Sequence, residues 1–315
     1  MPLFLGIDTS NYTTSAAVYD SESGKMTNCG KLLPVKKGTL GLRQSDAVFH
    51  HTRQLPEVIE QLNTSCDGLT NIAAVGASSA PRSNENSYMP CFLCGEGLAR
   101  SVSAFNDVPM YRTTHQKGHI LAAVYSCGHT ELLNAPFIAF HVSGGTTDCL
   151  YVTPDSDSVI SVEEISTSLD LHAGQAVDRV GTMLSLDFPC GKALEALALK
   201  SSAEFKFKPT IKDGSICLSG LENRCRDMLE RNVPHEDVAR YCIEYISSSV
   251  AAMTDYAVNK LGSLPLLYAG GVMSDSIIRE RFTRDYGAFF ASPAYSCDNA
   301  AGVAFYTYLL WSKNK

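Results

Sequence analysis

The chain has 315 residues, of which 45% are hydrophobic and 19% charged, and its formal net charge is −7. This composition excludes an intrinsically disordered chain, and the absence of any run of 18 uncharged apolar residues excludes a predicted membrane span. The acidic balance argues against strong unaided binding to nucleic acid, so an RNA substrate requires a partner or a local basic patch. The candidates for such a patch are Lys36-Lys37, Arg43, Arg53 and the group Lys206, Lys208 and Lys212, and an ordinary solvated surface explains each of them equally well.

The first residues predict a β-hairpin. Residues 3–7 are typical of a buried strand, residues 8–14 of a polar turn and residues 15–19 of the returning strand. A second copy of this design follows in residues 137–142, 143–148 and 149–152. Thr13-Thr14 and Thr146-Thr147 occupy the same place in the two copies, 146 − 13 = 133 residues apart, which indicates an internal duplication.

Helices and further strands alternate in the rest of the chain. Apolar periodicity predicts helices and strands in the following ranges: helices 46–62, 91–105 and 114–126, strand 72–76, helices 175–185, 192–199 and 236–261, strand 264–268, and a closing helix from 298. This alternation predicts an α/β fold. The length predicts two lobes with a cleft between them, residues 1–134 closed by the C-terminal helix 298–315, and residues 135–297.

Two histidines and a distant acid are candidate metal ligands. His115 and His119 are four residues apart and therefore face the same way on a helix. With Asp298 they make three protein ligands, which leave coordination positions open, as in catalytic metal sites. The alternative is one buried, hydrogen-bonded histidine and one surface histidine. Gln116 stands where His-Glu-x-x-His peptidases have their general base, so metallopeptidase activity is the least favoured.

Glycine-rich turns after strands are candidate ligand-binding loops. Residues 143–146 and residues 269–272, with the turn of the first hairpin, can present backbone N–H groups to phosphate or sugar. Each turn alone is commonplace, but three in this order are not accidental. Asp8 either orients a metal-bound water or phosphate, or accepts hydrogen bonds from its own turn. Asp170 and Asp178 flank Gly174-Gln175, either as helix caps or as ligands of ribose hydroxyls.

The motifs of this chain, taken in order, match the pattern of a known protein family. The chain resembles the tRNA threonylcarbamoyladenosine synthase family, historically labelled glycoprotease or O-sialoglycoprotein endopeptidase. The resemblance runs nearly end to end and rests on Gly6-Ile7-Asp8-Thr9-Ser10, His115 to His119, Val142-Ser143-Gly144-Gly145-Thr146, Ser168 to Asp178, Leu186 to Gly191, Leu218 to Leu221, Ala269-Gly270-Gly271-Val272 and Asp298-Asn299-Ala300.

The resemblance implies a fold and a set of site residues. The fold is that of the actin-like ATPases, with two RNase H-like lobes. His115, His119 and Asp298 match the ligands of one divalent metal ion, iron or zinc. The catalytic set is Asp8, Ser143 and Thr146. The set that binds the adenylate, an ATP- or AMP-type nucleotide, is His141, Val142, Ser143, Gly144, Gly145, Gly174, Asp178, Gly191, Glu195, Gly270, Gly271 and Asp275.

The resemblance also implies an activity. A threonylcarbamoyl group moves from an adenylate to a tRNA adenosine next to the anticodon, with the metal polarising the carbonyl and AMP leaving. The implied partners are tRNA, an adenylate-forming enzyme and a scaffold paralogue, with no membrane. The odd number of cysteines, 11, and the lack of a signal-peptide pattern favour reduced thiols and a cytoplasmic protein. The oligomeric state stays open.

Several departures from the family pattern indicate a divergent paralogue. Tyr12 and Thr13 replace two acids of the first loop, Thr146 replaces a histidine, Gln175 a glutamate and Asp275 an asparagine. Two alternatives therefore stay open beside the tRNA activity. One is a carbamoyltransferase or kinase that acts on a small molecule, and the other is a non-catalytic nucleotide-binding subunit of a tRNA-modification complex.

Overall fold

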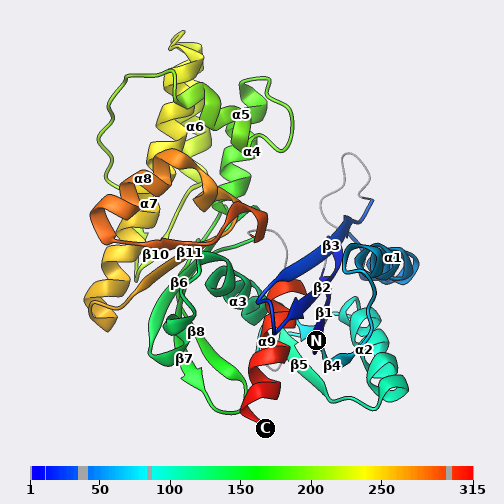
Figure 1. Ribbon diagram of the computed structural model, residues 1–315. Coiled ribbons are helices and arrows are strands. Elements are labelled where there is room, and N and C mark those ends of the chain that lie inside the picture. Colours follow the sequence, from blue (N-terminus) through cyan, green and yellow to red (C-terminus); the bar gives the residue numbers. More distant parts are fainter. Residues whose placement is uncertain (1, 11, 35–41, 84–86, 296–299, 315) are drawn as a thin grey trace. The chain divides into compact units, whose positions relative to one another are not determined.

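The computed structural model describes residues 2–10, 12–34, 42–83, 87–295 and 300–314 (Figure 1). The chain forms two compact units. Unit 1 contains Met1–Gly128, Asp155–Ile160 and Cys297–Lys315, and unit 2 contains His129–Pro154 and Ser161–Ser296. The division expected from the sequence placed its boundary after residue 134 and did not assign residues 155–160 to the N-terminal part.

Unit 1 is built on one five-stranded sheet with the strand order β3-β2-β1-β4-β5. Strands β1, β2 and β3 are antiparallel neighbours, whereas β1, β4 and β5 run parallel. The elements of this unit are β1 (Leu3–Ser10), β2 (Thr13–Asp20), β3 (Met26–Leu32), α1 (Gln44–Ser65), β4 (Ile72–Ala80), α2 (Phe92–Asn106), β5 (Met110–Thr114), α3 (His115–Cys127) and α9 (Ala300–Lys313).

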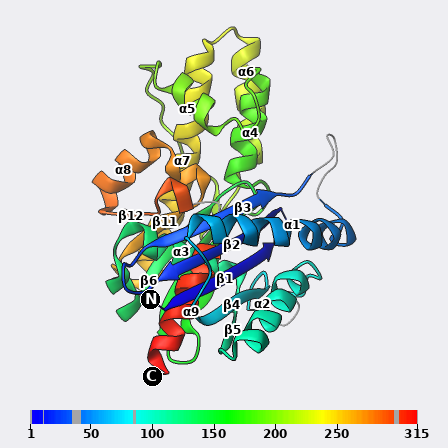
Figure 2. The same cartoon turned by 45° about the vertical axis from the view of Figure 1, so that its right-hand side comes forward.

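Alternation along β1 divides the side chains of this sheet between two faces. Leu5 and Ile7 point to one face, where they pack with Leu55 and Val58 of α1 and Ala99 of α2. Phe4 points to the other face, where its ring packs edge-on against Trp311 of α9 at 5.0 Å. The sheet of unit 1 therefore has α1 and α2 on one face and α9 on the other (Figure 2).

Three glycines allow α9 to approach its neighbours closely. A Cβ at Gly6 of β1 or at Gly76 of β4 would collide with α9, at Ala304 and Thr307 respectively. A Cβ at Gly302 of α9 would collide with the carbonyl of Gly118 in α3. Since the three glycines lie on β1, β4 and α9, the absence of side chains lets the last helix lie directly on the backbone of β1, β4 and α3.

Unit 2 repeats the sheet arrangement with the strand order β12-β11-β6-β7-β8. Strands β6 and β7 are antiparallel, and β6, β11 and β12 run parallel. Its elements are β6 (Phe137–Val142), β7 (Thr147–Asp155), β8 (Val159–Thr167), α4 (Ala173–Met183), α5 (Gly191–Ala198), β9 (Ile211–Lys212), β10 (Ser215–Ile216), α6 (Ser219–Glu230), α7 (His235–Leu261), β11 (Leu266–Ala269), α8 (Ser276–Tyr286), β12 (Phe289–Phe290) and the 3₁₀ turns η1 (Thr130–Asn134), η2 (Gly271–Ser274) and η3 (Pro293–Tyr295).

The two sheets make the duplication visible in the structure, with one correction. The second strand begins at Thr13 in unit 1 and at Thr147 in unit 2, a separation of 147 − 13 = 134 residues rather than 133. The innermost pairs are Ser10 with Thr13 and Val142 with Thr147, so the second turn is two residues longer. Because the second turn is longer, Thr13 corresponds to Thr147 and not to Thr146.

The core of unit 2 lies between its sheet and the long helix α7. Ile138, Phe140 and Val142 of β6 share one face by alternation, and they pack in one cluster with Ile246 and Val250 of α7. Phe140 also stacks on Tyr268 of β11 with ring centroids 4.6 Å apart. This packing fixes the ends of β6 and β11, from which two of the candidate turns leave.

Most long elements follow the predicted pattern. The helices expected at 46–62, 91–105, 114–126, 175–185, 192–199 and 236–261 correspond to α1, α2, α3, α4, α5 and α7, and from residue 300 the closing helix corresponds to α9. Helices α6 and α8 and strands β3, β5, β8, β9, β10 and β12 were not predicted. No helix in the described part of the chain is long and apolar enough to cross a membrane.

Candidate functional site

The candidate metal residues of unit 1 gather where β1 meets the start of α3. The carboxylate of Asp8 lies 3.1 and 3.2 Å from Nδ1 of His115. An ionised carboxylate can only accept, so Nδ1 of His115 carries a proton and Nε2 points away from this bond. The ring of His119 lies one turn along α3, with its centroid 4.7 Å from that of His115.

Burial and hydrogen bonding act in opposite directions on Asp8. Its side chain is 1% exposed, and burial by itself raises the pKa of a carboxyl group. The charge and hydrogen bond of His115, together with the hydroxyls of Ser78 and Ser10, outweigh burial and hold the pKa of Asp8 below its ordinary value. Asp8 is therefore ionised at neutral pH and fixes the orientation of the imidazole.

A second buried polar group, which the sequence did not reveal, lies behind Asp8. The hydroxyl of Thr14 donates to Oε1 of Gln54 at 2.8 Å and accepts from Nδ1 of His51 at 2.8 Å. His51 is fully buried, and burial lowers its pKa, so the ring is neutral. His51 and Gln54, three residues apart among apolar neighbours of α1, were the available signal. They fasten α1 to β2 beside the candidate site.

The ring nitrogens of His115 and His119 fit a divalent ion of the iron or zinc type. Such ions take neutral imidazole nitrogens, and their histidine ligands usually donate the other ring N–H to a carboxylate, as His115 does to Asp8. Among the described residues, no three His, Cys, Asp or Glu side chains form a complete metal cluster. Asp298, the third predicted ligand, lies outside the described residues.

In unit 2 the structure brings two of the predicted turns together with the start of α4. The amide of Gly174, at the start of α4, donates to the carbonyl of Ser143 at 3.0 Å, and a Cβ on Gly174 would lie 2.5 Å from the nitrogen of Gly144. A Cβ on Gly270, which has φ of 98°, would collide with the carbonyl of Val142. The β6–β7 turn, the start of α4 and the β11–η2 turn are therefore in backbone contact.

The β6–β7 turn exposes the groups that a phosphate could reach. Ser143 donates its amide to the carbonyl of Thr146 at 2.7 Å, which closes the turn. Gly144 and Gly145 are exposed, with open space where a Cβ would be, while His141 and Val142 are buried in β6. This turn has room for a ligand above its glycines, and its flanking strand residues support it from below.

The predicted nucleotide residues on the helices of unit 2 are engaged with the protein backbone. Asp178 of α4 accepts from the amide of Cys190 at 2.9 Å, just before Gly191 begins α5. Glu195 accepts from the amide of Ser276 at 2.8 Å and from its hydroxyl. These bonds tie α4, α5 and the start of α8 to one another.

Asp275 serves as the N-cap of α8. Its carboxylate accepts from the amides of Ile277 at 2.9 Å and Ile278 at 3.2 Å. Burial raises the pKa of Asp275 to about 6, and the charge of Glu195 acts in the same direction, against the hydrogen bonds from the amides. Gly271 is the first residue of η2, which ends just before Asp275. It is exposed, with open space at its Cβ position.

Two further predicted positions have capping roles. Asp170 accepts from the amides of Leu218 at 2.7 Å and Ser219 at 3.2 Å, so it caps α6 rather than the helix that begins near Gly174. Gln175 accepts from the amide of His172 at 3.4 Å at the start of α4. The neutral amide at this position can make the capping bond that a glutamate would make.

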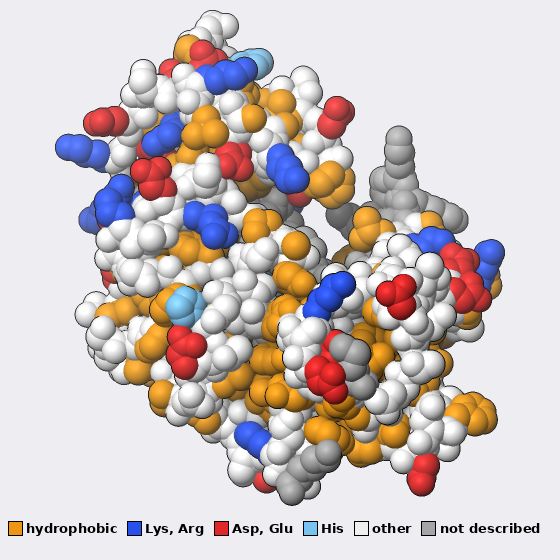
Figure 3. Space-filling model, viewed as in Figure 1, with side chains coloured by type: hydrophobic (Ala, Val, Ile, Leu, Met, Phe, Trp, Pro, Cys, Tyr) orange, Lys and Arg blue, Asp and Glu red, His pale blue; other side chains and the backbone are white. Residues whose placement is uncertain are grey.

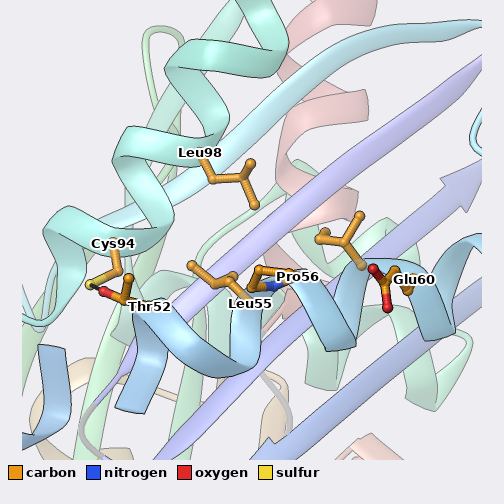
Figure 4. A pocket seen from close by; sticks show the side chains of 7 residues that line it. Thr52, Leu55, Pro56, Glu60, Cys94 and Leu98 are labelled. Atoms are coloured by element: carbon orange, nitrogen blue, oxygen red, sulfur yellow. Dashed lines mark hydrogen bonds between the residues drawn. The ribbon is translucent and has the colours of Figure 1, made fainter. Parts of the chain in front are cut away.

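A separate groove lies between α1 and α2 in unit 1 (Figure 4). It has a volume of about 420 Å³, and the hydroxyl of Thr52 lies 3.7 Å from the sulfur of Cys94 across it. None of the predicted site residues is among its lining, which is Thr52, Leu55, Pro56, Ile59, Glu60, Cys94 and Leu98. This groove is not part of the candidate site.

A family model described as "TsaD: tRNA N6-adenosine threonylcarbamoyltransferase" matches residues 37–305, which span both units. The chain belongs to the tRNA N6-adenosine threonylcarbamoyltransferase family. It is 28% identical over 319 aligned positions to the tRNA N6-adenosine threonylcarbamoyltransferase of Persephonella marina, covering 96% of this chain and 89% of that protein. The family resemblance read from the motifs is thereby confirmed, and the family is one of transferases.

Solved structures confirm the fold. Component A of the (R)-2-hydroxyglutaryl-CoA dehydratase of Acidaminococcus fermentans matches with a TM-score of 0.60 and 16% identity, covering 100% of both chains. HypF of T. kodakarensis matches with a TM-score of 0.62 and 13% identity, covering 99% of this chain and 48% of that one. Identity this low establishes the fold alone. With its duplicated sheets, the threonylcarbamoyltransferase-family chain has the predicted α/β, actin-like ATPase fold.

Proposed function

We propose that this protein transfers a threonylcarbamoyl group from an adenylate to N6 of a tRNA adenosine next to the anticodon. The observation that carries the proposal is the Asp8–His115 hydrogen bond beside His119, in a chain that the family model matches over residues 37–305. In the reaction the adenosine amine attacks the carbamoyl carbon, the bond from that carbon to the phosphate oxygen breaks, AMP leaves and the amine proton passes to solvent.

His115, His119 and Asp298 would hold one divalent ion, iron or zinc. When bound, such an ion supplies Lewis acidity that polarises a carbonyl group. Asp8 keeps a proton of His115 on Nδ1, so Nε2 is the nitrogen that would bind the ion. Asp298 precedes Gly302 by 302 − 298 = 4 residues, and Gly302 contacts the backbone of Gly118, next to His119. The short separation of Asp298 from Gly302 in the sequence supports our proposal of Asp298 as the third ligand.

Unit 2 would bind the adenylate. Gly144 and Gly271 are exposed glycines in turns whose backbone amides suit phosphate oxygens, while the amide of Gly145 donates to the hydroxyl of Ser143 at 3.3 Å. Ser143 and Thr146 offer hydroxyls to the carbamoyl end. The buried His141 and Val142 hold the turn in place, as do Gly174 and Gly270 through their backbone contacts. We assign the adenosine part to the surroundings of Asp178, Gly191, Glu195 and Asp275.

The proposed activity is tested by reconstitution. Purified, metal-loaded protein is incubated with threonine, bicarbonate, ATP, an adenylate-forming enzyme and unmodified tRNA, and the digested nucleosides are separated by mass. We expect the threonylcarbamoyl adenosine to form only when every component is present. A scaffold paralogue is added in a parallel reaction, because the family resemblance implies one. No modified nucleoside in either reaction would refute the proposal.

A carbamoyltransferase or kinase that acts on a small molecule is the second candidate. It is favoured by the first loop, where Tyr12, 46% exposed, stands in place of an acid of the family pattern. It is also favoured by Glu195 and Asp275, whose carboxylates are engaged in holding the start of α8. Nucleotide turnover that does not depend on tRNA would select this candidate.

A further inference from the structure

An extended segment joins α5 to β9 in unit 2 and alternates strictly between two environments. Ser202, Glu204, Lys206, Lys208 and Thr210 are exposed, and the residues between them are partly buried. Lys212 of β9 continues the exposed row. Because side chains alternate across an extended chain, Lys206, Lys208 and Lys212 point away from the protein on the same side. Lys206 and Lys208 are then about 7 Å apart along the chain.

Aromatic side chains on the other side hold this segment against α7. Phe205 packs edge-on against Tyr241 with ring centroids 5.1 Å apart, and Phe207 packs against Tyr241 at 5.0 Å and Tyr245 at 5.6 Å. At the beginning of the segment, the hydroxyl of Ser201 donates to Asp237 of α7 at 2.5 Å. The lysines are thus presented from a fixed backbone rather than from a loose loop.

The charges of this row are not neutralised within the protein. No described carboxylate lies within 4.0 Å of Lys206, Lys208, Lys212 or the exposed Arg224 of α6, whereas Arg179 and Arg226 nearby both pair with Glu222. Residues 202–212 contain three lysines and one glutamate, a local charge of 3 − 1 = +2 in a chain of −7.

The surface over this part of unit 2 is rich in charged side chains. Lys and Arg side chains lie there with Asp and Glu side chains between them (Figure 3). We define the lysine row as Lys206, Lys208 and Lys212. In an acidic protein, a fixed row of unpaired cations is a surface for a polyanion.

We infer that the lysine row is where this protein contacts the phosphate backbone of its RNA substrate. The inference rests on the proposed function, which supplies a tRNA, and adds the surface that an acidic chain needs to bind it. An extended RNA backbone presents successive phosphates, and each lysine that meets one releases counterions. The row offers point charges, which meet phosphates and not base edges. It therefore contributes affinity that does not depend on RNA sequence.

The test compares two triple variants of the full chain. The first is Lys206→Ala, Lys208→Ala and Lys212→Ala, and the matched control removes three exposed positive charges from unit 1 as Lys25→Ala, Lys31→Ala and Arg100→Ala. Binding of unmodified tRNA is measured by filter retention between 50 and about 200 mM salt, the range over which phosphate contacts weaken. We expect the first variant to bind roughly tenfold or more weakly at low salt, with the slope of log K against log salt reduced by about 2 to 3. The control should match the wild type.

Further outcomes decide between explanations. A slope unchanged by the first triple variant, with the wild type still binding and modifying tRNA, overturns the inference and leaves the proposed function intact. Loss of binding to anionic phosphatidylserine vesicles, with tRNA binding unaffected, assigns the row to a membrane and also overturns it. If the triple variant does not fold, the three single variants replace it, each expected to lower the slope by about 0.7 to 1. Replacing all three lysines by arginine should preserve binding.

Discussion

Asp8 and His115, 107 residues apart in the chain, meet through a hydrogen bond of 3.1 Å between the carboxylate and Nδ1 of the imidazole. The carboxylate is almost completely buried, and the imidazole belongs to the first turn of α3. This relationship decides which ring nitrogen of His115 faces the carboxylate and which one is left for a metal ion. It therefore connects the strand that begins the fold to the chemistry proposed for the histidine pair.

Asp8→Asn tests this connection. An amide in place of the carboxylate can donate to Nδ1, which would move the imidazole proton to Nε2 and weaken metal binding. We expect zinc or cobalt affinity to fall by about 10- to 100-fold. Metal titration followed by cobalt absorption provides the measurement. Asp20→Asn at the end of β2 makes the same chemical change outside the site and should leave affinity unaltered. Equal affinity in wild type and Asp8→Asn would show that Asp8 does not position a ligand.

Gly302→Ala tests the packing of α9 on α3. The new Cβ would collide with the carbonyl of Gly118, so the helices must separate. Overpacking of this kind lowers the free energy of unfolding by about 1 to 3 kcal/mol, which urea denaturation measures. Gly220→Ala in α6 is the control, because nothing lies within 4 Å of its Cβ position and alanine favours the helix. A variant as stable as the wild type would disprove the close contact.

Gly174→Ala tests the contact between α4 and the β6–β7 turn. The added Cβ would lie 2.5 Å from the nitrogen of Gly144, so the turn must shift. If the turn binds phosphate, a shift that costs about 1.4 kcal/mol raises the dissociation constant of an adenine nucleotide roughly tenfold. Calorimetric titration of the folded variant gives this constant, with Gly220→Ala again as the control. Unchanged nucleotide affinity would remove the turn from the proposed site.

Asp275→Asn tests the buried cap of α8. Burial raises the pKa of Asp275 to about 6 in the folded state from 3.8. Between these values the folded protein binds more protons than the unfolded chain, so the contribution of Asp275 to stability falls as the pH rises through this window. Asparagine caps a helix equally well without the charge. We therefore expect Asp275→Asn to raise the free energy of unfolding by about 1 to 2 kcal/mol at pH 8 and to add nothing at pH 4.

The control for this prediction lies on the same helix. Asp285 is held in its ionised form by Arg284, whose hydrogen bond lowers the pKa of Asp285. The same substitution there, Asp285→Asn, should give no gain at pH 8. If Asp275→Asn gives no gain either, the carboxylate of Asp275 is better solvated than its burial indicates.

The sequence predicted the elements whose apolar side chains repeat with one clear period. The hairpins and the helices α1, α3 and α7 belong to this class. It did not predict β3 or β8, because half-exposed edge strands such as Val159–Thr167 alternate weakly. Nor did it predict α8, where Ile278 and Phe282, four residues apart, are the buried residues of an otherwise polar helix.

The candidate site was predictable in its residue types and less so in its partners. The i, i+4 spacing of His115 and His119 is visible in the sequence, but a bond that spans 107 residues is not, and Asp8 was therefore left with two interpretations. The capping partners of Asp170 lie 48 and 49 residues away, so no local pattern distinguished a cap from a ligand. Tertiary contact, rather than spacing, decided these roles.

The most direct test of the proposed activity is a single-turnover reaction in which threonylcarbamoyl-adenylate is supplied ready-made. Metal-loaded wild type and His119→Ala are each mixed with this adenylate and unmodified tRNA, and the mass of the adenosine next to the anticodon is measured. We predict the threonylcarbamoyl mass increase with the wild type and none with His119→Ala, while His129→Ala, at an exposed histidine paired with Glu131, behaves as the wild type. An unmodified adenosine with folded, metal-loaded wild type would contradict the proposal.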